Sequence, residues 1–171
     1  MIYLKKTVLL LLGILVIFCF AACGNTLKGE GDIIEKARKE IPVADIENMD
    51  INIIGSHSFG DRQVFWLMTG NEYQNNRYFA METDVKGEDK YKFLKLYEPI
   101  DRGEDIRVLI YRCVGENVAD LYHLFMINNP ECVKMVINGE EIDVDSHPFV
   151  YKYKELEGEY LFLDKDGKEI Y

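Results

Sequence analysis

The chain has 171 residues and a net charge of −10, and 12% of its residues are aromatic. This length and composition suffice for one domain, or two small lobes sharing an interface, with a buried core. The acidic balance argues against nucleic acid as a partner, because such binders need a basic face to displace counterions from phosphates, and it disfavours anionic lipid headgroups.

Residues 1–22 have the pattern of an export signal. Lys5 and Lys6 form a short basic head that stays on the cytoplasmic side, and an uncharged apolar run from Val8 to Ala22 follows. As a helix this run would rise about 22 Å, which is short against a hydrocarbon core of about 30 Å. An uncleaved anchor helix and a plain secretory signal cut after Ala22 are alternatives, but both leave Cys23 without a role.

The end of this segment resembles the processing site of bacterial lipoprotein signal peptides. That site has an aliphatic residue, two small residues and an obligatory cysteine, which here are Phe20, Ala21, Ala22 and Cys23. The resemblance implies that Cys23 receives a diacylglycerol before cleavage and that Cys19 is discarded with the signal. It therefore implies a lipid anchor at Cys23 on the outer face of the bacterial cytoplasmic membrane, with the membrane as partner.

A tether and a helix are predicted next. Residues 23–31 are polar and rich in glycine, which favours a flexible coil between lipid and fold. Asp32 is a good helix N-cap, and Glu35 stands three residues on, close to a capping-box arrangement. The apolar face of this helix is predicted to consist of Ile34, Ala37 and Ile41, and Pro42 ends it.

From Ile51 onward the pattern becomes that of short strands, rich in aromatic and β-branched residues and separated by Gly, Asn and Asp. Asn138 and Gly139 give the strongest hairpin signal, because this pair tolerates the positive φ angles of a type I′ turn. We therefore expect a mainly β (α+β) protein, in which one N-terminal helix precedes an antiparallel meander. The predicted strands are 51–55, 62–68, 77–85, 91–97, 105–113, 121–127, 132–137, 141–144, 149–153 and 160–163.

A weak break near residues 114–120 divides the predicted strands into a part at 32–115, with the helix, and a small β lobe at 118–171. The second part loosely resembles the small immunoglobulin-like domains of bacterial surface proteins. The resemblance lies in its closing hairpin, where Tyr160 enters a strand and Asp166 and Gly167 form the turn. It implies a β-sandwich lobe.

His57 is the first candidate for catalysis, because Ser56, Ser58 and Asp61 beside it supply the residue types of a hydrolase triad. A triad, however, is built from side chains that converge from separate parts of a fold. A turn between two strands, with Ser or Asp side chains capping the backbone, explains the same residues.

Two segments carry residue types that bind metals. Asp143, Asp145 and His147 alternate and would point to one side of a strand, where they could hold an ion or form a solvent-exposed face. Residues 164–167, Asp-Lys-Asp-Gly, resemble the start of a calcium loop but lack its later ligands, and a hairpin turn accounts for them. We expect no bound metal and no cofactor.

The remaining thiols and a group of aromatic residues leave two further alternatives. Cys113 and Cys132 could form a disulfide in an exported domain, or Cys113 could be a buried free thiol at the end of a strand. The aromatic residues could line a sugar or peptide groove, but alternation in the strand at 62–68 favours burial on both faces. These aromatic residues are Phe65, Trp66, Tyr73, Tyr78 and Phe79.

Two functions from different classes follow. The first is a non-enzymatic, lipid-anchored binding or interaction module outside the cytoplasm, whose protein or small-molecule ligand the sequence does not name. The second is a small cell-envelope hydrolase or metal-dependent enzyme that uses His57 or the group Asp143, Asp145 and His147.

Overall fold

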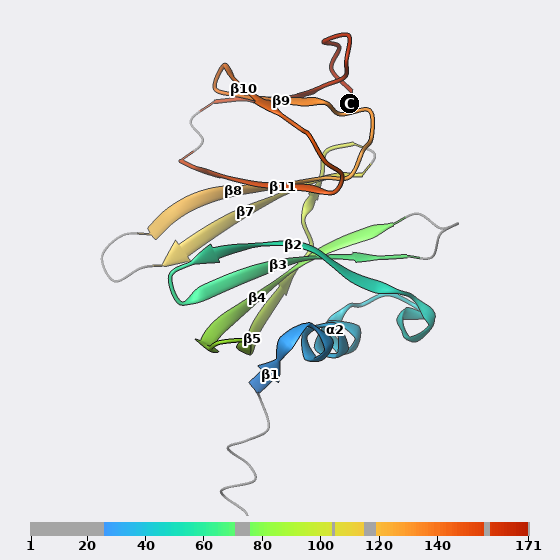
Figure 1. Ribbon diagram of the computed structural model, residues 1–171, viewed down its shortest axis with the longest axis vertical. Coiled ribbons are helices and arrows are strands. Elements are labelled where there is room, and N and C mark those ends of the chain that lie inside the picture. Colours follow the sequence, from blue (N-terminus) through green and yellow to red (C-terminus); the bar gives the residue numbers. More distant parts are fainter. Residues whose placement is uncertain (1–25, 71–75, 104, 115–118, 156–157, 171) are drawn as a thin grey trace, which may run out of the picture.

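A computed structural model of the protein describes residues 26–70, 76–103, 105–114, 119–155 and 158–170, and these form four layers. One helix covers a five-stranded sheet, a four-stranded sheet packs on the other face of that sheet, and a three-stranded sheet forms the last layer (Figure 1). With 58% of residues in strands and 11% in helices, the predicted mainly β fold is confirmed, and the stacked sheets are sandwich-like.

The strands pair in antiparallel order within each sheet, and the predicted strands are present. The five-stranded sheet has the order β1-β5-β4-β3-β2, with β1 (Thr26–Lys28), β5 (Lys90–Tyr97), β4 (Arg77–Gly87), β3 (Arg62–Thr69) and β2 (Ile51–Phe59). The four-stranded sheet has the order β11-β8-β7-β6, with β11 (Phe149–Lys154), β8 (Ala119–Ile127), β7 (Ile106–Val114) and β6 (Ile100–Asp101). The three-stranded sheet has the order β10-β9-β12, with β10 (Glu140–Asp143), β9 (Lys134–Ile137) and β12 (Tyr160–Leu163).

Helix α2 (Gly29–Glu40) begins earlier than the sequence predicts. Lys28 occupies the N-cap, and the Asp32 carboxylate, placed inside the first turns, accepts a hydrogen bond from the Lys28 backbone N–H at 2.7 Å. The buried face consists of Ile33, Ala37 and Ile41, so Ile33 takes the place expected for Ile34, which is only half-buried. A short 3-10 turn at Ile46–Asn48 then leads to β2.

The predicted tether at 23–31 is wrong over most of its length. Residues 26–28 form β1, which pairs with β5, and residues 29–31 belong to α2. Gly29 makes this possible, because its φ of +67° turns the chain from strand into helix, a backbone conformation that glycine adopts without strain. Within the predicted tether, only residues 23–25 precede the first strand.

The five-stranded sheet is buried on both faces, as alternation along residues 62–68 predicts. Phe65 and Leu67 of β3 face the helix, whereas Val64 and Trp66 face the four-stranded sheet. The two sheets approach closely at Gly55, where an added Cβ would lie 2.6 Å from a Val150 methyl carbon of β11. A β-bulge in β2 between Ile53 and Gly55 shifts the register just before this contact.

The outer core lies between the four-stranded and three-stranded sheets, around Phe125, Met135 and Phe162. Asn138 and Gly139 connect β9 to β10 with φ angles of 50° and 83°, which confirms the predicted type I′ hairpin.

The predicted division at 114–120 falls between β7 and β8, which pair with each other from Ile106 to Val114. The two predicted parts therefore share the four-stranded sheet.

Candidate functional site

The structure does not bring together the hydrolase-type residues near His57. His57 lies opposite Val64 and points toward the four-stranded sheet, whereas Ser56 and Ser58, its neighbours along β2, are exposed on the other face. Ser56 Oγ instead accepts a hydrogen bond from Gln63 Nε2 at 3.0 Å. A serine nucleophile and its base must be within hydrogen-bond reach, and this alternation separates them.

His57 is a structural residue in this arrangement. It is 8% exposed, and its Nε2 atom has no hydrogen-bond partner in the part of the chain that the structure describes. Burial, together with the positive charge of Lys152 on β11, lowers its pKa from 6.5 to about 4. The imidazole is therefore neutral at physiological pH and adds polar bulk to the interface between the two sheets.

The candidate metal ligands are also separated. Asp143 is the last residue of β10, and Asp145 follows the buried residue Val144 outside the strand. The Nε2 atom of His147 lies 3.0 Å from the carbonyl oxygen of Cys132. No group of three or more His, Cys, Asp or Glu side chains among the described residues is arranged to hold a metal ion.

The calcium-like segment at 164–167 forms a turn closed by protein groups. The Asp164 carboxylate accepts hydrogen bonds from the backbone N–H groups of Asp166 and Lys168, each at 2.9 Å. Leu163 and Glu169 form a β-bridge across this turn, in agreement with the predicted hairpin.

The disulfide considered between Cys113 and Cys132 is absent, and both are free thiols. Cys113 is half-buried against the core between the five-stranded and four-stranded sheets, whereas Cys132 is fully buried in the outer core. The four-stranded sheet therefore lies between the two cores in which they are packed. Burial raises the pKa of both thiols, which keeps them protonated and poorly reactive.

The aromatic residues considered for a groove belong mainly to the cores. Phe65 and Phe79 pack under α2, and Trp66 and Tyr78 pack between the two larger sheets. Tyr73 lies outside the described residues. Phe65, however, also reaches the edge of the helix-covered core, where it borders an open cleft.

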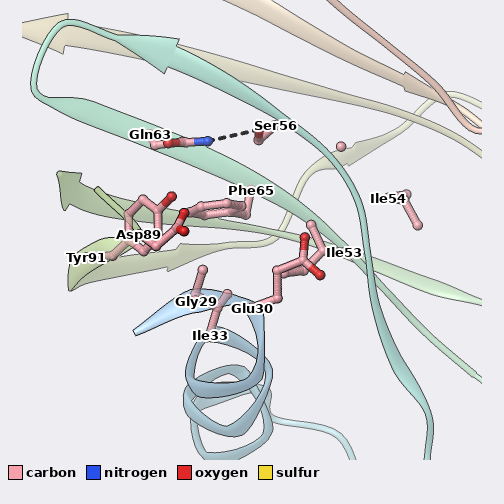
Figure 2. A pocket seen from close by; sticks show the side chains of 11 residues that line it. Gly29, Glu30, Ile33, Ile53, Ile54, Ser56, Gln63, Phe65, Asp89 and Tyr91 are labelled. Atoms are coloured by element: carbon pink, nitrogen blue, oxygen red, sulfur yellow. Dashed lines mark hydrogen bonds between the residues drawn. The ribbon is translucent and has the colours of Figure 1, made fainter. Parts of the chain in front are cut away.

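This cleft, about 680 Å³ in volume, lies between the first turn of α2 and strands β2, β3 and β5 (Figure 2). Its apolar walls come from Ile33 of the helix, Ile53 of β2 and Phe65 of β3. Tyr91 of β5 stands edge-on to Phe65, with ring centres 5.2 Å apart and planes at 90°. The cleft thus has an aromatic wall next to aliphatic side chains.

Two carboxylates from different elements lie at this cleft. Glu30 belongs to the first turn of α2 and Asp89 to the turn between β4 and β5, and both are exposed. The Gly29 backbone N–H donates to the Asp89 carbonyl oxygen at 2.9 Å, which fastens the helix start to that turn. Burial raises the pKa of Tyr91, and the negative charges of Asp89 and Glu30 raise it further because they disfavour ionisation of the Tyr91 hydroxyl group.

A polar pair completes the cleft at the β2–β3 end. Ser56 and Gln63, joined by their hydrogen bond, line it beside Phe65, as Figure 2 shows. The cleft therefore combines apolar contact area, an aromatic wall, hydrogen-bonding side chains and negative charge, which are the components of a small-molecule site.

Sequence reasoning missed these residues for identifiable reasons. Glu30 lay in the predicted tether, and Asp89 lay in a Gly-Glu-Asp segment interpreted only as a turn. The signal available was the pair of acids at Glu30 and Asp32, which is typical of a helix first turn. Recognising it would have moved the helix start but would not have brought Asp89 beside it.

The lipidation candidate Cys23 lies outside the described residues. No helix in the described part of the chain is long and apolar enough to cross a membrane.

Searches of family models, curated proteins and solved structures find no significant match to this chain.

Proposed function

We propose that the protein is a lipid-anchored binding or interaction module without enzymatic activity, held by Cys23 on the outer face of a bacterial cytoplasmic membrane. The observation that carries this proposal is the sequence of residues 1–22, in which Lys5 and Lys6 precede an uncharged apolar run that ends at Ala22, directly before Cys23.

The anchor and the domain supply different parts of this function. Each buried CH₂ of an acyl chain contributes about 0.8 kcal/mol to membrane binding, and two chains hold a protein stably where one does not. Loss of residues 1–22 removes two lysines and no acid, so the net charge goes from −10 to about −12. An acidic domain gains little from anionic headgroups, so the lipid provides the membrane affinity.

The short connection also places the cleft near the membrane. Gly29 lines the cleft and is six residues after Cys23, a span of at most about 20 Å for extended chain. A ligand in this cleft would therefore be held close to the bilayer surface. Because the serine and histidine of the hydrolase alternative point to opposite faces of β2, binding accounts for the geometry better than hydrolysis.

Metabolic labelling with an alkyne-bearing palmitate in a bacterial host tests the anchor. We expect label on the wild-type chain and on C19S, because Cys19 is removed with the signal, and none on C23S. Mass spectrometry should place the lipid on the N-terminal residue of the mature chain. Undiminished label on C23S, or an intact chain in the cytosol that retains residues 1–22, would refute the proposal.

A further inference from the structure

We propose that the cleft beside the first turn of α2 binds a small organic cation, an ammonium group carried on an apolar body. This inference rests on the proposed binding function and names the chemical class of its ligand. It follows from the size of the cleft, the character of its walls and the sign of the charges around it.

The size and lining of the cleft fit a small molecule. Its volume of about 680 Å³ lies within the range of small-molecule sites, roughly 300–1,000 Å³. The partly buried side chains of Ile53 and Tyr91 offer apolar surface for the body of a ligand, with Ile33 and Phe65 buried behind them. The edge-to-face contact of Tyr91 with Phe65 helps to fix the aromatic wall.

The charges favour a cation. Glu30 and Asp89 approach the cleft from two different elements, and none of its described lining residues is a lysine or arginine. A helix N-terminus by itself attracts anions, through a partial positive charge of about half an elementary charge. Here the carboxylates of Glu30 and Asp32 in the first turn offset that partial charge, which disfavours an anionic ligand at this helix end.

The aromatic wall supports the same choice. An ammonium group within about 6 Å of a tyrosine or phenylalanine face is attracted by the ring quadrupole. Burial and then the charges of Asp89 and Glu30 raise the pKa of Tyr91, so both carboxylates lie close enough to this ring to act on its hydroxyl group. A cation here would interact with both carboxylates and with the ring, while Ser56 and Gln63 remain available for polar groups of the ligand.

Benzylammonium and benzoate are matched probes, because they share a ring and differ in the sign of the charge. We would titrate each into the full chain as it is isolated from the bacterial host, in neutral detergent micelles, and follow backbone amide chemical shifts by NMR. We expect saturable shifts at Gly29, Ser56 and Tyr91 with benzylammonium and none with benzoate. Equal shifts with both probes, or benzylammonium shifts spread over acidic surfaces elsewhere, would overturn the inference.

Charge-removing variants locate the effect. E30Q and D89N should each raise the Kd for benzylammonium about three- to fivefold, and the double variant about tenfold. D89N is a mild change because asparagine tolerates the positive φ of 48° at this position. E47Q is the control, since Glu47 is exposed on the 3-10 turn outside the cleft and its loss removes the same charge. An E47Q effect as large as that of E30Q would refute a site-specific interaction.

The labelling and titration experiments fail independently. Benzylammonium binding by a chain that receives no lipid would overturn the proposed anchor while supporting the ligand class. Normal lipid labelling of Cys23, together with absent benzylammonium binding, would overturn the ligand class and leave the anchor standing. Melting temperatures of E30Q and D89N near that of wild type establish that a weaker response reflects the site rather than unfolding.

Discussion

Acidification should destabilise the fold through His57. The imidazole has a pKa of about 4 in the folded protein because it is buried and faces Lys152, whereas in the unfolded chain its pKa is near 6.5. The unfolded state therefore binds a proton that the folded state does not bind between these values. Stability is fully present above about pH 6.5 and falls as the pH decreases toward about 4.

The expected magnitude follows from these two pKa values. Between about pH 7.5 and about pH 5, the linkage relation gives a loss of about 2 kcal/mol in the free energy of unfolding from this single group. If the pH is lowered through both pKa values, the total loss in the free energy of unfolding from this group is about 3 kcal/mol, because each pKa unit of difference corresponds to roughly 1.4 kcal/mol. Against a typical domain stability of about 5–15 kcal/mol, either change is measurable.

Urea unfolding followed by Trp66 fluorescence is a suitable assay, because the indole is fully buried in the same core that His57 faces. The wild-type chain should lose about 2 kcal/mol between about pH 7.5 and about pH 5, and H57Q should lose markedly less. H123Q is the comparison variant, because burial also lowers the pKa of His123, which lies on the opposite face of the four-stranded sheet. Replacing His123 should therefore also reduce the dependence of the unfolding free energy on pH. Identical slopes for wild type and H57Q would refute the reasoning.

Two further predictions concern packing. G55A should reduce the free energy of unfolding by about 1–3 kcal/mol, because the new methyl group would lie 2.6 Å from a Val150 carbon, and V150A in the same chain should restore part of the loss in urea melts. Alkylation without reductant should modify Cys113 before Cys132 in the native protein and modify both after unfolding, as read by mass spectrometry; a disulfide would leave both unmodified.

Local patterns were sufficient to predict the helix, apart from its start, and every described strand except β1 and β6. The strand at residues 62–68 was identifiable because its apolar residues suit a sheet buried on both faces, and Asn138-Gly139 specified its own turn through positive φ angles. The start of α2 was not predictable by the same means. The start of the helix depends on the pairing of β1 with β5, in which Leu27 lies opposite Tyr91. Strand β1 has only three residues, Thr26–Lys28, and a segment this short has too few apolar residues to be recognised as a strand from its sequence.

The candidate site depended on non-local events that periodicity does not contain. Glu30 and Asp89 are far apart in the sequence, and the β1–β5 pair together with the Gly29–Asp89 backbone hydrogen bond brings their elements together. Lipidation at Cys23 remains a prediction from the sequence, because that residue lies outside the part of the chain that the structure describes.

The bulge in β2 determines which face each candidate residue occupies. Uninterrupted alternation from Ile51, which packs under α2, would place His57 on the helix side and Ser56 on the other side. The extra residue between Ile53 and Gly55 reverses this, so that Ser56 lies at the cleft and His57 is buried against the four-stranded sheet. One inserted residue thus supplies the cleft with a polar side chain, gives the sheet interface an acid-sensitive histidine, and separates the residues that resembled a catalytic group.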